Sequence, residues 1–558
     1  MDTQRIVLFF IFGFSVLMLW DAWEKEHRPR PVAQVTVPAA VPGPAAKPGA
    51  QPATAPAAPR APEGTVPGAA TPAAKGETVV VRTDLVIAEI DTLGATLKRV
   101  ELLKHKDAKD SAQNLVLLGP EHQYEAQSGL TGDGGPNHRT LWRMEPGGTT
   151  LEAGQPALEV RFIAQGKDGL AVTKLYRFVR GSYEIEVSLE LKNTGSAPVS
   201  PATYFQLTHD GKTSADANAV AETFGAQSFN GFAVYTEEQK FQKVQLSDVD
   251  KGKADYVKQA TDGWLAYIQH YFVAGWIPPA KASRSSEVLK RDDGVYAGYV
   301  RLPAGTLEPG AATVVKVPLY AGPQEQQRLA AVAPGFDLVV DYGWLTIIAW
   351  PLFWLLEKYH LLSGNWGVAI ILLTVTIKLV FFPLSAASYR SMAKMKLVTP
   401  RLTKLREQYG DDRAKLNQAM MEMYKTEKVN PLGGCLPIVI QIPVFISLYW
   451  VLLAAVELRH APFFGWIKDL AAADPFYVLP VIMGATMFLQ TKLNPTPPDP
   501  IQAKVMLYMP IVFSFMFLWF PAGLVLYWTV NNLLSIWQQW QINRMTEQAA
   551  AKKGNAKR

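Results

Sequence analysis

Four apolar segments in the C-terminal part of the chain constrain its fold more than any other feature. They cover residues 366–383, 432–456, 476–493 and 506–536. Apolar segments of about 20 residues are typical of helices that cross a lipid bilayer. One of them, ILLTVTIKLVFFPLS, contains Lys378, and a charge inside the hydrocarbon costs about 3 kcal/mol or more unless it snorkels, is paired or lies in water. The segments predict a polytopic α-helical membrane protein with a lysine, Lys378, inside one of its spans.

The N-terminal region predicts an anchor and a tether. Residues 6–20, IVLFFIFGFSVLMLW, precede the charged stretch DAWEKEHR. No small-x-small cleavage site follows directly, so we expect an uncleaved transmembrane anchor over residues 1–28. Residues 29–77 are rich in proline and alanine, a composition that cannot build a core and favours an extended, semi-rigid linker.

Residues 78–335 show the patterning of an all-β domain. In SYEIEVSLEL, apolar residues from Tyr183 to Leu191 alternate with Ser and Glu, which indicates a strand with one buried face. Arg180-Gly181 fits a hairpin turn before it. Many short strands separated by Gly, Asn, Asp and Pro predict a large antiparallel sandwich.

Nothing in the sequence indicates an enzyme, a cofactor or a metal centre. The β region contains no HExxH, Walker loop or nucleophile elbow, and we expect core or surface roles for its scattered histidines: His105, His122, His138, His209 and His270. The single cysteine, Cys435, excludes an intramolecular disulfide and a multi-cysteine zinc site, and its apolar surroundings predict a packed thiol. The net charge of +6 comes without a basic stripe in a soluble region, so we expect no sequence-specific nucleic-acid binding.

Residues 336–363 differ from the spans that follow. DYGWLTIIAWPLFWLLEKYHLL is rich in aromatic residues, contains Pro351 and ends with Glu357-Lys358. These features favour an amphipathic helix that lies along the membrane surface over a helix that crosses it.

Positive charges predict the topology of the spans. Ten Lys and Arg residues lie in residues 386–430, whereas the connection at 457–474 has only Arg459 and Lys468. The positive-inside rule places the first connection and the basic tail, residues 546–558, in the cytoplasm. Two segments on the same side of the membrane must be joined by an even number of spans. Pro521-Ala522-Gly523 must therefore divide the last apolar segment into two short helices, 506–520 and 524–542. Counting back gives six transmembrane helices, cytoplasmic N- and C-termini and an external β domain.

Polar residues mark the inside of the predicted bundle. Thr374, Lys378 and Ser385 are expected to share one face of their helix, and the last helix has a stripe that includes Asn531, Asn532, Ser535, Gln538 and Gln539. Gln441 lies in another span. These side chains favour a hydrophilic cavity with Lys378 as its positive charge. Two other interpretations stay open: Lys378 snorkels to the cytoplasmic headgroups, and the amides join helices to one another.

The cytoplasmic connection predicts a helical hairpin at residues 386–430 that turns at Gly410-Asp411-Asp412. It is charged and rich in methionine, which suits an adaptable surface for nonpolar clients or lipid. Its candidate contact residues are Met392, Met395, Lys396, Arg401, Arg406, Asp411 and Asp412. The alternative is that the methionines only pack the two helices together.

The chain resembles the bacterial YidC membrane protein insertases, relatives of the mitochondrial oxidase-assembly and chloroplast thylakoid insertases. The resemblance is carried by GNWGVAI, by YRSMAKMKLVTPRLTKLREQYGDDRAKLNQAMMEMYKTEKVNPLGGCLPIVIQIPVF, and by ELRHAPF, LPVIMGATMF and FLWFPAGLVLYW. It implies an insertase core of five helices over residues 364–545, and it implies that residues 78–335 form a periplasmic β-supersandwich in the Gram-negative form of the family. The implied location is the bacterial inner membrane.

The same resemblance implies the site. The family's groove carries a positive residue, commonly arginine, that attracts polar parts of a nascent chain; Lys378 occupies that position here. Thr374, Gln441, Tyr527 and Trp528 fall at or near groove positions. The implied partners are nascent membrane proteins, the Sec translocon, the ribosome or targeting factors, and lipids.

The leading functional hypothesis is therefore an insertase and chaperone for inner-membrane proteins that works alone or with the Sec translocon. A solute transporter or channel that uses the same cavity is the alternative. It would favour paired ionisable residues at mid-membrane and repeated half-domains, and the sequence shows neither. An enzyme on the β domain is a third possibility, which requires a convergent polar cleft.

Overall fold

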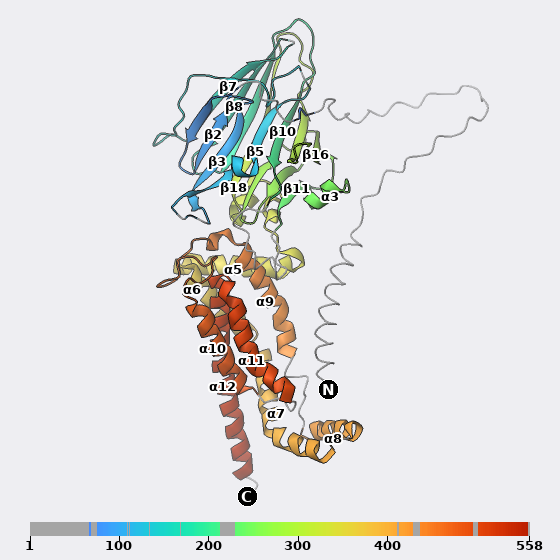
Figure 1. Ribbon diagram of the computed structural model, residues 1–558, viewed down its shortest axis with the longest axis vertical. Helices are drawn as coiled ribbons and strands as arrows, with labels where there is room; N and C mark the ends of the chain where they lie inside the picture. Colours follow the sequence, from blue (N-terminus) through green and yellow to red (C-terminus); the bar gives the residue numbers. More distant parts are fainter. Residues whose placement is uncertain are drawn as a thin grey trace, which may run out of the picture.

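The computed structural model describes residues 66–68, 75–108, 110, 112–132, 134–167, 169–212, 229–409, 412–427, 436–494 and 500–555. The predicted anchor and most of the predicted linker lie outside these residues. Figure 1 shows two parts, a β-sheet region and a helical region, that meet at α5 (Thr346–Ser363).

The β region contains two nine-stranded sheets in which the strand pairs are antiparallel. The first follows the order β1 (Thr78–Arg82), β2 (Val86–Asp91), β3 (Thr96–Lys106), β5 (Glu125–Leu130), β10 (Ala202–His209), β17 (Tyr296–Pro303), β16 (Arg284–Lys290) and β13 (Gln259–Ala260), with β4 (Asn114–Leu118) paired to β3. The second follows the order β12 (Lys240–Val244), β11 (Gly231–Thr236), β14 (Trp264–Ile268), β15 (Phe272–Trp276), β18 (Ala312–Pro323), β9 (Glu184–Asn193), β8 (Leu170–Val179), β7 (Ala157–Gln165) and β6 (Arg143–Met144).

The predicted alternation in β9 is confirmed. Ile185, Val187, Leu189 and Leu191 are buried, and Gly181, with φ of 73°, provides the turn between β8 and β9. Ring contacts then join the two sheets. Phe205 of the first sheet packs on Trp276 of the second, with centroids 5.2 Å apart. The apolar faces of the strands therefore form a common core between the sheets.

The sheets connect to the helices through α4 (Gln326–Val332), η2 (Phe336–Val339) and η3 (Gly343–Leu345). α5 then lies across the end of the helical region, between the sheets and the long helices (Figure 1). Polar contacts also join the parts directly: His270 Nε2 lies 3.1 Å from the carbonyl oxygen of Leu453, and His460 Nε2 lies 3.4 Å from that of Lys106. Lys243 of β12 pairs with Asp341 in the connecting segment.

The helical region contains α6 (Trp366–Val380), α7 (Phe382–Tyr409), α8 (Arg413–Thr426), α9 (Leu436–Ala454), η5 (Val456–Leu458), α10 (Val478–Leu493), α11 (Pro500–Met516), η6 (Phe517–Trp519) and α12 (Ala522–Asn555). The predicted break at Pro521 is confirmed, because α12 begins at the next residue. α12 packs against α6, α7 and α10, and it extends beyond the other helices toward the C-terminus (Figure 1).

Within the described residues, no single helix has both the length and the hydropathy of a bilayer span. The pair Trp366–Val380 and Phe382–Met395 meets both requirements together and is bent by 67°. Three shorter apolar helices cover Gln441–Ala454, Val478–Leu493 and Ala503–Trp519.

Candidate functional site

The helix that carries Lys378 ends sooner than the sequence predicted. α6 stops at Val380, and Ser385 lies beyond the bend, in α7. The prediction that Thr374, Lys378 and Ser385 share one face of a continuous helix is therefore wrong. Pro383 explains the break, since its ring disfavours helical geometry at the preceding residue and it has no N–H to bond back to α6.

Lys378 points at α12. Its Nζ donates a 2.7 Å hydrogen bond to Ser535 Oγ, and Ser535 Oγ donates in turn to the carbonyl oxygen of Asn531 at 2.7 Å. Tyr389 of α7 lies beside Ser535. Three helices thus meet at one ammonium group, which is half-buried. Among the described residues, the ammonium has one hydrogen-bond partner for its three donors.

The next polar residues of α12 contact α10 instead. Asn532 Nδ2 donates to Thr486 Oγ1 at 3.3 Å, and Gln539 Nε2 donates to Asn494 Oδ1 at 2.9 Å. These two contacts match the interpretation that amides join neighbouring helices. The stripe on α12 is therefore divided between α6 and α10.

Three further buried polar atoms on α9 and α12 have no described partner. They are Gln441 Nε2 on α9 and Trp528 Nε1 and Gln538 Nε2 on α12, all buried. Trp528 packs on Phe445 with ring centroids 4.7 Å apart, and Gln441 lies beside Tyr527. A buried donor without a partner costs about 1–3 kcal/mol, so each of these atoms is typical of a place where water or a ligand supplies the missing acceptor.

Thr374 differs from the other predicted groove residues. It is buried, and its Oγ1 donates to the carbonyl oxygen of Ile370, one turn earlier on its own helix. Its hydroxyl is therefore occupied within α6.

The predicted hairpin region contains two helices, α7 and α8. Asp412 Oδ1 accepts a 3.1 Å hydrogen bond from the backbone N–H of Lys415, which caps the start of α8. Arg401 pairs with Glu427 and so joins the helices. Met392 and Met395 are half-buried, whereas Met421 is exposed. Asp411 and the side chains of Lys396 and Arg406 lie outside the described residues.

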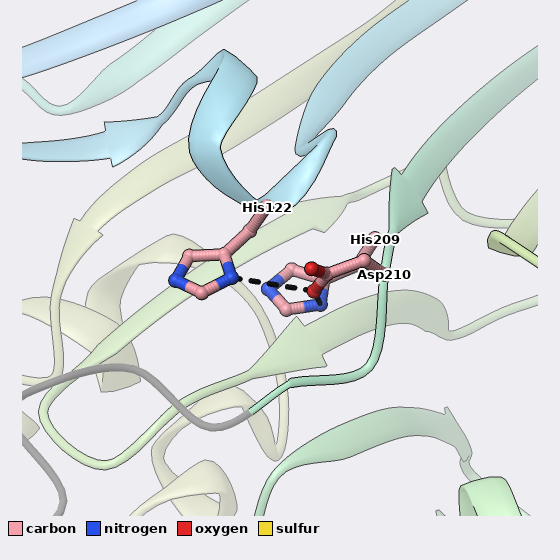
Figure 2. Close-up of side chains that lie close together, drawn as sticks. All are labelled: His122, His209 and Asp210. Carbon is pink, nitrogen blue, oxygen red and sulfur yellow. Dashed lines mark hydrogen bonds and ion pairs between the residues drawn. The ribbon is translucent and has the colours of Figure 1, made fainter.

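The β region brings together three side chains that sequence reasoning left apart. His122, at the end of η1 (Pro120–His122), lies beside His209 and Asp210 at the end of β10 (Figure 2). Asp210 Oδ1 is 3.3 Å from His122 Nδ1 and 3.4 Å from His209 Nδ1. No spacing signal could have found this group, because 87 positions separate its two histidines and only the sheet unites them.

The donor set would suit a transition metal, but the geometry does not. His209 Nδ1 accepts a 2.9 Å hydrogen bond from the backbone N–H of Gly211, so its lone pair is occupied. The two imidazole rings are stacked, with planes 9° apart, whereas a shared ion must lie in the plane of each ring. Burial lowers the pKa of His209 to about 3, so this ring stays neutral. We assign the group a structural role in joining η1 to β10.

Comparison with known proteins identifies both parts of the chain. Residues 78–355 match the model of the YidC periplasmic domain, and residues 358–550 match that of the 60Kd inner membrane protein. The chain is 53% identical to the membrane protein insertase YidC of Aromatoleum aromaticum, over 98% of both chains, and 52% identical to that of Nitrosospira multiformis, over 100% of both. A crystal structure of an active YidC insertase with its first transmembrane domain resolved covers 83% of this chain and 94% of its own, with a TM-score of 0.38 and 18% identity.

Proposed function

Because the chain belongs to the YidC family of membrane protein insertases, we propose that Lys378 is the positive charge of a hydrophilic groove that receives the nascent chain. Members of this family are bacterial inner-membrane proteins with a periplasmic domain, and they act on nascent membrane proteins. The family is an insertase family and not a class of catalytic enzymes.

The hydrogen bond between Lys378 and Ser535 carries this proposal. It turns the ammonium into the bundle, toward α12, and, as far as the described residues show, leaves two of its three donors for a client. Acidic or polar parts of a client would accept these hydrogen bonds, which lowers the cost of moving them into the hydrocarbon layer. Gln441, Trp528 and Gln538 would add donors nearby. Tyr527, Asn531, Asn532 and Ser535 complete the proposed lining.

The proposed architecture follows the number of membrane spans predicted from the sequence. Residues 1–28 form the anchor, 29–77 the periplasmic linker, 78–335 a β-supersandwich, 336–363 an interfacial helix and 364–545 a core of five transmembrane helices. Both termini are cytoplasmic, and the tail at 546–558 is basic. The placement of α5 between the sheets and the long helices supports the interfacial role, and so do its exposed Ile347, Trp350 and Trp354.

We propose further that the hairpin of α7 and α8 meets clients, the ribosome or targeting factors, and that the periplasmic domain meets the Sec translocon. The exposed Met421 and the Arg401–Glu427 pair support a stable hairpin with an adaptable apolar surface. Lipids cover the exposed apolar faces of the core helices.

Charge reversal tests the groove. Lys378→Glu is expected to reduce insertion of a single-span client with an acidic translocated tail about tenfold or more, since the tail then meets a like charge. Lys378→Arg is expected to insert it normally. Lys492→Glu, at the end of α10, is the matched control for charge reversal in the bundle. Equal insertion by Lys378→Glu and the parent chain in reconstituted vesicles would refute the groove charge. Photo-crosslinks from positions 374, 378 and 528 to a stalled client test its path.

A further inference from the structure

The second sheet contains a gap where one strand stops and its neighbour continues. β15 pairs with β18 from Phe272↔Pro323 to Trp276↔Leu319, and a last bond runs from Ile277 N to the carbonyl oxygen of Pro318. Pro278 and Pro279 follow, and proline cannot donate to a strand ladder. β18 continues to Ala312 and is paired there only with β9 among the described residues. The side of β18 that faces away from β9 is therefore an open edge from Ala312 to Val317.

The alternation of hydrogen bonds identifies which groups are unpaired. Ala321 N bonds toward β9, to Tyr183, whereas the Pro318 carbonyl bonds toward β15. In β18, the backbone N–H and C=O groups of odd-numbered residues thus point toward β9, and those of even-numbered residues point toward the gap. The backbone N–H and C=O of Val314 and Lys316 consequently point into the gap. Neither residue has a described backbone partner on that side.

A buried arginine holds the opposite wall of the gap. The guanidinium of Arg284, which is 3% exposed, donates to the carbonyl oxygens of Gly263 at 2.7 Å, Thr261 at 3.0 Å and Pro278 at 3.2 Å, and also to that of Pro279. These bonds fix the segment after β15 against the segment before β14. The segment cannot swing back to cover β18 without breaking the bonds from Arg284 to Pro278 and Pro279.

The gap opens into a cleft of about 680 Å³, a volume typical of ligand sites. Its apolar lining includes Ile277, Val314 and Val332, and its charged lining includes both Glu237 and Lys281. Val314 is 60% exposed. Lys316 also lines the cleft, and its Nζ pairs with Glu186 of β9 at 2.8 Å.

We propose that this gap accepts an extended polypeptide segment as an added strand beside β18, and that the occupant is the periplasmic segment of a client during its insertion. The proposal rests on the proposed insertase function. Unpaired backbone groups recognise any extended chain through its own backbone, and side-chain pockets add the specificity in such pairings. A lining that is apolar with charges of both signs selects no single sequence, which suits clients of many sequences. Lysine and proline at a sheet edge restrict pairing with a further strand. Lys316 and Pro318 therefore keep this pairing short and transient.

A photo-crosslinking residue at Ala280, in the lining of the cleft, tests the proposal in the full-length protein. It is placed in the parent chain, in Val314→Pro and in Val314→Thr, and each is given a stalled single-span client with a long periplasmic tail. Val314→Pro removes the N–H that points into the gap and leaves the β9 ladder intact, while Val314→Thr keeps that N–H. We expect a client adduct in the parent and in Val314→Thr, and a yield about three- to tenfold lower in Val314→Pro, the value of one hydrogen bond.

A client with a short tail separates this proposal from the insertase function. Its insertion is expected to be equal in all three chains, which shows that the core works and that Val314→Pro is folded. If Val314→Pro fails this control, Lys316→Pro replaces it, since Lys316 N–H points into the same gap. An undiminished adduct in the proline variant, an adduct to residues 29–77 of the same chain or to a second copy, or no client adduct while the client inserts would each overturn the proposal.

Discussion

The β domain and the helical core each turn one lysine ammonium inward, and they satisfy it differently. Lys174 of β8 is 0% exposed and donates to the carbonyl oxygens of Gly94 at 2.6 Å, Ala95 at 3.3 Å and Ser128 at 2.8 Å. Lys378 has one described acceptor, the hydroxyl of Ser535. The ammonium of Lys174 has acceptors for all three of its donors, so it joins the two sheets and has no free donor for a ligand. An ammonium with spare donors suits a site that must bind and release polar groups.

Burial lowers the pKa of Lys174 well below its ordinary value. Three carbonyl acceptors each need an N–H donor, however, and only the protonated ammonium supplies three. The ring of Trp142, with its centroid 4.8 Å from Nζ, adds a cation–π contact. This lysine is a structural link between the sheets.

The largest expected effect is that of Lys174→Met. It leaves the buried carbonyl groups of Gly94 and Ser128 without the ammonium donor, while Ala95 keeps its hydrogen bond from the Tyr176 hydroxyl, and we expect it to lower the stability of the β domain by about 3–5 kcal/mol. Thermal unfolding of the detergent-solubilised protein measures this. Lys192→Met, at an exposed position of the neighbouring strand β9, is the control. An equal loss in both variants would show that the carbonyl contacts of Lys174 contribute nothing.

A smaller effect is expected from pH at the junction of the two regions. Burial lowers the pKa of His270 to about 4, although its hydrogen bond to Leu453 opposes the shift. A group whose folded-state pKa is depressed below 6.5 favours the neutral ring, so its contribution is complete above pH 6.5 and is lost as pH falls toward 4. We expect protease accessibility of the junction to rise over that window. His270→Gln keeps a donor for Leu453 without a titratable ring and should flatten the response; an unchanged pH profile in this variant would contradict the assignment.

The hydrogen bond between Asn532 of α12 and Thr486 of α10 should contribute still less to stability. Asn532→Leu removes the hydrogen bond to Thr486, and polar contacts between membrane helices average about 0.6 kcal/mol. We expect a similarly small decrease in the thermal stability of the helical core and, because Asn532 belongs to the proposed lining, a modest decrease in insertion. Unchanged insertion would remove Asn532 from the lining.

The smallest effect on stability is expected from Lys378→Met, even though this change should reduce insertion of acidic-tailed clients. Its single hydroxyl partner, Ser535, keeps its own bond to Asn531, so no buried acceptor is left unpaired. Unfolding and insertion measured on one preparation separate the two lysines: Lys174→Met should affect mainly the first and Lys378→Met mainly the second. Strong destabilisation by Lys378→Met would remove the distinction.

Local chemistry made several features predictable from the sequence. The alternation in β9, the turn at Gly181, the helix cap at Asp412 and the break at Pro521 all depend on residues within one or two turns of each other. The end of α6 also has a local cause, Pro383, but the apolar residues continue past it, which is why the sequence predicted one helix there. Ser385 was misplaced for that reason.

Other features depend on residues that the chain brings together from far apart. The sequence by itself determined the apolar segments, the cationic hairpin, the β patterning and the position of a lysine in a span, because composition and periodicity act locally. Only the tertiary structure decided that Lys378 meets Ser535, that Lys174 is enclosed by three carbonyls, that His122 lies beside Asp210, and that β18 extends past the end of β15. Each of these is a hydrogen bond, or a missing one, between segments far apart in the chain, and its energy depends on distance and direction in space, which no local pattern encodes.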